Sequence, residues 1–297
     1  MRLLPPIRVL VLTLAASAVA WLPVPSKAQV FRGNVDLTRV YPLVTGPDGR
    51  LATNLEASDF EVRDNGQLVD ITAFSTDRQP ITALVMLDMS ASMEDRWLRV
   101  RDAAVRFVDA IDKDDRLRFG TFGSEIAISP HLTGDKKILT RVLREELWPG
   151  GSTPLWNAMN AAMQSIAQEP GRKTIVTVTD GVDTISTANT MHNVVADRAV
   201  REQFMLYSIG FEGKGLGDRM LSLIARTGGG HFDLRRSDDM GAAFLRFADE
   251  LRHQYLVGFT PAALDGRTHT LEVRVTRPGF TVRAPQQFVA PLRKAPR

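Results

Sequence analysis

The 297-residue sequence contains no cysteine. This absence excludes disulfide frameworks, thiolate catalysis, zinc ribbons, iron–sulfur clusters and a lipid-modified N-terminal cysteine. Only 7% of the residues are aromatic, whereas 44% are hydrophobic and 24% are charged, which is typical of a globular protein. Without covalent cross-links, the chain is expected to depend on its apolar core for stability.

An excess of charge of one sign is also lacking once the first residues are set aside. The first 28 residues contain Arg2, Arg8 and Lys27 but no acid. Without these three, 34 of the 37 basic residues remain, against 34 acidic ones. A large cationic field is therefore not supported, and no nucleic acid is expected as a partner.

Residues 1–28 have the pattern of an export signal. Two arginines precede a charge-free run of 14 residues from Val9 to Leu22, and Ser26-Lys27-Ala28 places small residues where a signal peptidase reads them. The apolar run is shorter than the roughly 20 residues that span a bilayer. We expect cleavage after Ala28 and an exported protein, periplasmic or secreted, with no membrane span after cleavage.

The remaining sequence changes its pattern twice. Residues 29–79 are rich in strand signals, among them a hairpin turn at Asp64-Asn65-Gly66 before a strand over 69–74. Across 80–253, short apolar strands alternate with amphipathic helices. This alternation predicts an α/β fold with a doubly wound, mostly parallel sheet and helices on both faces.

Strand signals return over residues 254–290, and 291–297 form a tail. We expect these C-terminal strands to pair with those of 29–79. The α/β domain would then be an insertion in a small β-sandwich, which is feasible because the two ends of an inserted domain commonly lie close together.

Polar side chains follow two buried strands and occupy one loop between them. Asp88, Ser90 and Ser92 come at the carboxyl end of the first buried strand. Thr153 lies in a Gly-Gly-Ser-Thr-Pro loop, and Asp180 lies in a Thr-Asp-Gly loop after the second strand. Ligands of open α/β sheets bind at this edge, where the strand order reverses, so we expect the five residues to converge there.

Together these residues offer two carboxylates and three hydroxyls, all hard oxygen donors. Such a set suits Mg²⁺, with Mn²⁺ or Ca²⁺ as variants, and argues against zinc or copper. Because the hydroxyls are neutral, direct ligands would not cancel the charge of the ion. A coordination position is then expected to stay open for an anionic oxygen, most simply a Glu or Asp of a partner protein.

The pattern Asp88-x-Ser90-x-Ser92 with Thr153 and Asp180 resembles the metal-ion-dependent adhesion site of von Willebrand factor type A domains. The resemblance implies that the two serines bind the metal directly. It implies that the threonine binds directly or through water, and that the two aspartates bind mainly through water. It also implies protein binding as the function of the domain.

The flanks resemble a wider bacterial group of exported proteins with such domains, first described in acidobacteria. A segment like Asp59–Gly66 precedes the domain in that group, and a strand like Tyr255–Phe259 follows it. Many von Willebrand factor type A domains have glycine where this sequence has Ala91, a difference that leaves every donor in place.

The function predicted is that of a non-enzymatic binding protein that captures a carboxylate of a partner protein, and the oligomeric state is left open. One alternative is a magnesium-dependent hydrolase of the haloacid dehalogenase type, with Asp88 as nucleophile. Such enzymes have a second aspartate two residues on, where this chain has Ser90. Another alternative is a β-sandwich that binds the cell envelope, with a merely structural metal.

Asp112-Lys113-Asp114-Asp115 superficially resembles a calcium-binding loop. It lacks the glycine at the sixth position and the terminal bidentate glutamate of such loops. The sequence therefore predicts a solvated loop between a helix and a strand.

Overall fold

The structure is a computed structural model that describes residues 37–147, 151–180, 183–184, 188–211, 217–235 and 239–293. The predicted export signal lies outside the described residues, as do the glycines at positions 150 and 181 in the two predicted loops. None of the helices in the described ranges combines the length and the hydropathy that a membrane crossing requires.

Residues 82–252 fold as alternating strands and helices. The strands are β6 (Thr82–Asp88), β7 (Arg116–Phe122), β8 (Ile126–Ile128), β9 (Lys173–Val178), β10 (Phe204–Phe211) and β11 (His231–Leu234). The helices are α1 (Trp97–Ala110), α2 (Lys136–Glu145), α3 (Leu155–Ile166), α4 (Ala188–Arg201), α5 (Asp218–Arg226) and α6 (Met240–Arg252). The strands form one six-stranded sheet in the order β11-β10-β9-β6-β7-β8, in which only β8 pairs antiparallel.

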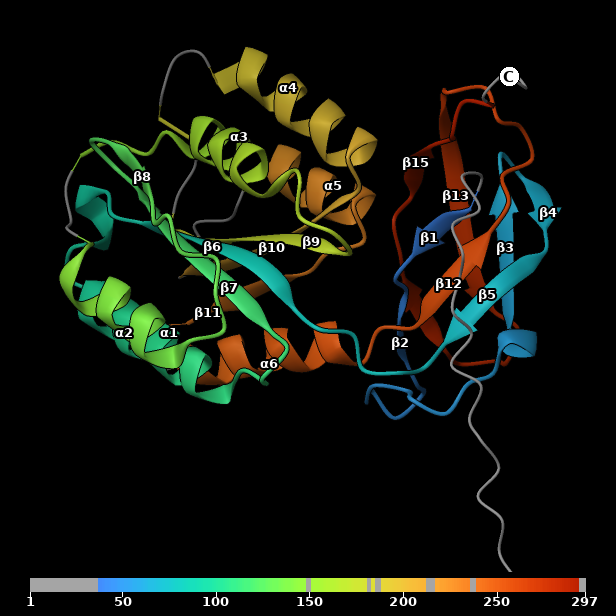
Figure 1. Ribbon diagram of the computed structural model, residues 1–297, viewed down its shortest axis with the longest axis horizontal. Coiled ribbons are helices and arrows are strands. Elements are labelled where there is room, and N and C mark those ends of the chain that lie inside the picture. Colours follow the sequence, from blue (N-terminus) through green and yellow to red (C-terminus); the bar gives the residue numbers. More distant parts are fainter. Residues whose placement is uncertain are drawn as a thin grey trace, which may run out of the picture. The chain divides into compact units, whose positions relative to one another are not determined.

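The apolar strand β6 shows why both faces of this sheet are covered. Val85 and Leu87 pack in a core with residues of α1, α2 and α6, whereas Leu84 and Met86 pack in a second core with residues of α3, α4 and α5. The two groups of helices lie on opposite faces of the sheet (Figure 1). The predicted doubly wound α/β fold is therefore confirmed.

The flanking segments form further strands around a third apolar core. They are β1 (Thr38–Val40), β2 (Leu43–Thr45), β3 (Phe60–Asp64), β4 (Gln67–Val69), β5 (Ile71–Ser75), β12 (Leu256–Phe259), β13 (Thr268–Val275), β14 (Thr281–Arg283) and β15 (Gln287–Val289). Strand β12 lies between β1 and β5, β13 lies between β3 and β15, and β14 pairs with β2. Strands that precede the α/β segment thus pair with strands that follow it.

The hairpin predicted at residues 64–66 is present, but the strand predicted over 69–74 is wrong in its extent. Asn65 and Gly66 have positive φ angles of 48° and 83°, as a two-residue hairpin turn requires. Strand β4 then ends at Val69, and β5 begins at Ile71 and pairs with β12 in the other sheet. The chain changes sheets at the exposed Asp70, so the apolar alternation on either side of it belongs to two strands.

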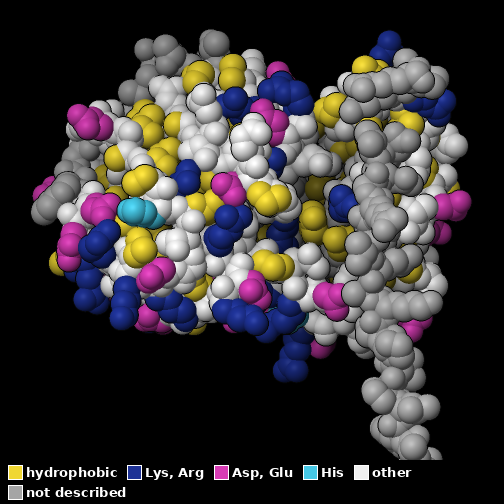
Figure 2. Space-filling view, viewed as in Figure 1, with side chains coloured by type: hydrophobic (Ala, Val, Ile, Leu, Met, Phe, Trp, Pro, Cys, Tyr) yellow, Lys and Arg dark blue, Asp and Glu magenta, His cyan; other side chains and the backbone are white. Residues whose placement is uncertain are grey.

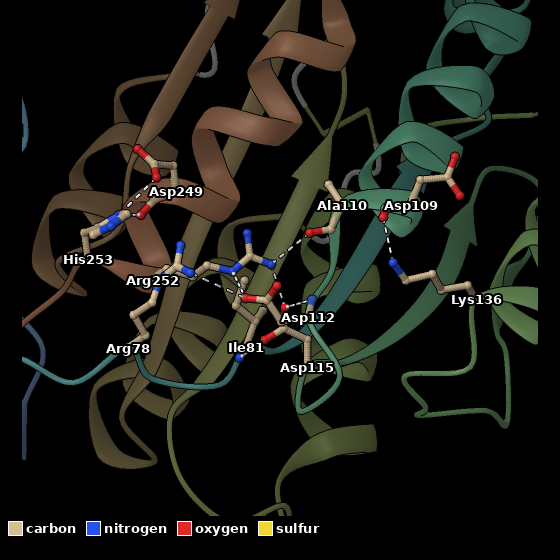
Figure 3. Close-up of polar contacts among 10 residues, drawn as sticks. All are labelled: Arg78, Ile81, Asp109, Ala110, Asp112, Asp115, Lys136, Asp249, Arg252 and His253. Atoms are coloured by element: carbon tan, nitrogen blue, oxygen red, sulfur yellow. Dashed lines mark hydrogen bonds and ion pairs between the residues drawn. The ribbon is translucent and has the colours of Figure 1, made fainter.

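The predicted solvated loop at 112–115 is correct for its place between α1 and β7 but wrong for Asp115, which is 2% exposed. Its carboxylate accepts hydrogen bonds from the amides of Ile81 (2.8 Å) and Asp112 (2.9 Å) and is paired with the guanidinium of Arg252 at 2.7 Å. Figure 3 shows this cluster. The carboxylate of Asp115, which lies just before β7, thus contacts both the end of α6 and the residue before β6.

A buried tyrosine connects the N-terminal segment to the strand after α6. The hydroxyl of Tyr255 donates to the carbonyl of Ala52 at 2.7 Å and accepts from the amide of Leu55 at 3.2 Å. Tyr255→Phe is expected to lower the free energy of unfolding by about 1–3 kcal/mol, because two buried backbone groups lose their partner. Urea unfolding of the two proteins measures the difference, and a change below about 0.5 kcal/mol would contradict this role.

Candidate metal centre

The carboxyl ends of β6 and β9 meet where the strand order of the sheet reverses. Strand β6 pairs in parallel with both β7 and β9, so later strands add on either side of it. Asp88 is the last residue of β6, and Asp180 lies two residues beyond the end of β9. Both aspartates therefore lie at the edge where ligands of such sheets bind.

The serine loop begins directly after β6 and contains a short 3₁₀ helix, Ala91–Met93. The Ser90 amide donates to Asp88 Oδ1 at 2.9 Å, which turns the chain back over the strand end. Ser90 Oγ lies 3.2 Å from Ser92 Oγ, within hydrogen-bond distance. Asp88 itself is fully buried, and its other oxygen accepts from the Thr179 hydroxyl at 2.5 Å.

The serine loop and the aspartate loop are joined by their side chains. Ser92 Oγ donates to Asp180 Oδ1 at 2.8 Å. Four of the five predicted residues thus form one connected polar group, in which the two hydroxyls lie between the two carboxylates. Ser92 is exposed to solvent and Asp180 is buried, so the group has an accessible side.

The loop that contains Thr153 contacts the serine loop through the backbone of Gly151. In its loop, the Gly151 carbonyl accepts a hydrogen bond from the Ala91 amide at 3.2 Å. Gly151 has φ 103°, and a Cβ there would lie 2.1 Å from the Ser124 nitrogen, so only glycine allows this close approach. Thr153 is buried, and its amide donates to the Thr184 hydroxyl at 3.0 Å. Within the described part of the chain, no hydrogen bond joins its own hydroxyl to the other four residues.

The sequence reading missed Arg96. Its Nη1 donates to Asp180 Oδ2 at 2.8 Å and to the Ser92 carbonyl at 2.9 Å, so this side chain connects the serine loop and the aspartate loop. It is 9% exposed. The only available signal was its place four residues after Ser92, just before α1, and many exposed arginines occupy such places. Thr179 belongs to the predicted Thr-Asp-Gly loop, but its bond to Asp88 was not predicted.

Burial raises the pKa of the Asp88 carboxyl above its ordinary value, and the negative charge of Asp180 raises it further. Hydrogen bonds from Ser90 and Thr179 act in the opposite direction. No three His, Cys, Asp or Glu side chains in the described ranges are placed to hold a metal together. The group instead offers hydroxyl and carboxylate oxygens with few charges, which are ligands that a hard dication accepts.

Residues 84–244 match the von Willebrand factor type A domain family, and the chain belongs to that family. Domains of this family typically mediate protein–protein interaction or adhesion and are generally not enzymes.

Solved structures are similar to this chain at low sequence identity. The von Willebrand factor type A protein from Catenulispora acidiphila is similar over 85% of this chain and 74% of its own, with 11% identity and a TM-score of 0.53. An aerotolerance-related membrane protein from Bacteroides fragilis is similar over 58% of this chain and 98% of its own, with 19% identity and a TM-score of 0.45. No curated protein sequence matches this chain significantly.

Proposed function

We propose that this protein is an exported, non-enzymatic binding protein that captures an exposed Asp or Glu of a partner protein through a divalent metal ion. The ion would be Mg²⁺, or alternatively Mn²⁺ or Ca²⁺, and the residues that would hold it are Asp88, Ser90, Ser92, Thr153 and Asp180. When bound, the ion supplies positive charge that attracts a carboxylate.

The observation that carries this proposal is the hydrogen bond between Ser92 Oγ and Asp180 Oδ1, together with the short distance between the Ser90 and Ser92 hydroxyls. Oxygens from two loops that are 88 residues apart in sequence lie within hydrogen-bond distance of one another. Helix capping needs only one such residue, whereas a shared ion needs several of them together.

The charges of the protein also favour a metal-mediated contact over binding of nucleic acid. On the face drawn in Figure 2, basic and acidic side chains lie among one another rather than gathering by sign. Export to the periplasm or the medium belongs to the same proposal, because it rests on the signal pattern of residues 1–28.

The two alternative functions lack comparable support. Asp88 has no exposed surface and both of its oxygens accept hydrogen bonds, so it is poorly placed to attack a substrate as a nucleophile. An envelope-binding sandwich would need exposed aromatic rings for a glycan. Tyr255 and Phe259, the aromatic residues of the Tyr255–Phe259 segment, are both buried.

Metal binding by the purified protein tests the proposal. We expect Ser92→Ala to weaken binding of Mn²⁺ or Mg²⁺ roughly 10–100-fold in calorimetric titrations, because the variant loses a ligand oxygen that also orients Asp180. Ser222→Ala, which removes an exposed hydroxyl from α5, is the matched control and should bind like the wild type.

Capture of a partner completes the test. From an envelope extract, the wild type is expected to retain a protein in Mg²⁺ but not in chelator, and Thr153→Ala should retain none in either condition. Equal capture by both proteins in both conditions would show that binding does not pass through the metal.

A further inference from the structure

A cavity of about 200 Å³ lies at the opposite edge of the parallel sheet from the candidate metal centre. Arg172 and Lys173, at the start of β9, form part of its wall, and Tyr41 and Phe288 from the flanking strands form another part. Seven residues of extended chain separate Lys173 from Asp180, which corresponds to roughly 20 Å. The cavity is thus separate from the candidate metal centre, and none of the five residues proposed to hold the metal lines it.

The wall of this cavity carries an excess of positive charge. Its basic side chains are Arg39, Arg172, Lys173 and Arg226. The acid in the same wall, Glu202, is already paired with Arg198 at 3.1 Å and with Arg201 at 3.4 Å. Glu202 therefore does not neutralise the positive charge of the four basic side chains in the wall.

Arg172 is the innermost of these cations and is only 7% exposed. Its Nη1 donates to the Leu251 carbonyl at 2.7 Å and contacts the side chain of Gln254, which are both neutral acceptors. Its Nε and Nη2 have no partner among the described residues, and its Cζ lies 5.4 Å from the centre of the Tyr41 ring. The charge of Asp115 acts on Arg172 from a distance, but no carboxylate forms a hydrogen bond with it. A buried guanidinium without a hydrogen-bonded carboxylate is costly, so a further negative charge nearby would be favoured.

The other three cations are not paired with acids either. Arg226 donates to Gln287 Oε1 at 2.8 and 3.1 Å, and Lys173 donates to a backbone carbonyl at 3.2 Å. The side chain of Arg39 is exposed and has no hydrogen bond or ion pair with the described residues. Two of the wall's cations are thus held in place by neutral groups, and one at the surface is available to a ligand.

From this wall we infer that the cavity binds a small oxyanion, a ligand with a carboxylate or phosphate group. Arg39 and Lys173 would contact that group, and the positive charge of the buried Arg172 would attract it. The volume is below the 300–1,000 Å³ of sites for larger organic ligands, so the ligand is small. The aromatic rings of Tyr41 and Phe288 would contact any apolar part of it.

The test is thermal unfolding of the purified protein in chelator, which removes any effect of a metal. Citrate and inorganic phosphate serve as probes at constant ionic strength, with chloride as the reference. We expect at least one probe to raise the unfolding temperature along a saturating curve, as binding to the folded state requires.

Arg39→Gln should raise the dissociation constant of that probe about tenfold, because one charged hydrogen bond is lost. This variant is chosen over Arg172→Gln because Arg39 is exposed and holds no other element in place. Arg144→Gln removes the same charge from an exposed site on α2 and should leave the dissociation constant unchanged. The inference is overturned if neither probe saturates relative to chloride, or if both variants weaken binding equally.

Discussion

Asp115→Ala is expected to lower the free energy of unfolding by about 3 kcal/mol, which is a large share of the stability of an ordinary domain. The substitution removes the buried carboxylate that Arg252 faces at 2.7 Å and leaves the amides of Ile81 and Asp112 without their acceptor. The loss falls at the lower end of the range for broken buried pairs, because Arg252 keeps an ion pair with Asp112 at 3.1 Å (Figure 3).

Asp114→Ala provides the control, since Asp114 is the exposed neighbour in the same loop. Its stability in chemical denaturation should lie within about 0.5 kcal/mol of the wild type. If both variants were equally stable, Asp115 would not connect α6 to the sheet in the way that its contacts indicate.

Asp115 also illustrates what the sequence could not predict. The strands and helices of the α/β fold could be predicted from the sequence because each has a local pattern. An example is the continuous apolar run of β6. Burial of one acid in a run of four charged residues depends on Arg252, which follows 137 residues later and has no local signal.

The candidate site was predictable to a similar degree. Asp88, Ser90 and Ser92 could be placed at a strand end, and the parallel topology brings Asp180 to the same edge. The topology alone does not say which side chains donate hydrogen bonds to the aspartates. Arg96 and Thr179 take that role through side-chain directions that only the folded chain defines.

Arg96 makes it possible to separate the stability of this site from its capacity to bind metal. The ion pair between Arg96 and Asp180 is buried, with side-chain exposures of 11% and 3%. Asp180→Ala is expected to lower the free energy of unfolding by about 3–5 kcal/mol, because the buried guanidinium of Arg96 loses the carboxylate that it faces at 2.8 Å. The same variant should lose metal binding altogether in calorimetric titrations.

Adding Arg96→Met to Asp180→Ala should recover most of the lost stability, because replacing a buried ion pair by apolar groups is often close to neutral. Metal binding should not return, because the carboxylate is still missing. The double-mutant cycle is measured by chemical denaturation for stability and by titration with Mn²⁺ for binding. Recovery of metal binding in the double variant would mean that Asp180 is no part of the metal centre. A double variant no more stable than Asp180→Ala would mean that the loss of stability does not come from the guanidinium of Arg96.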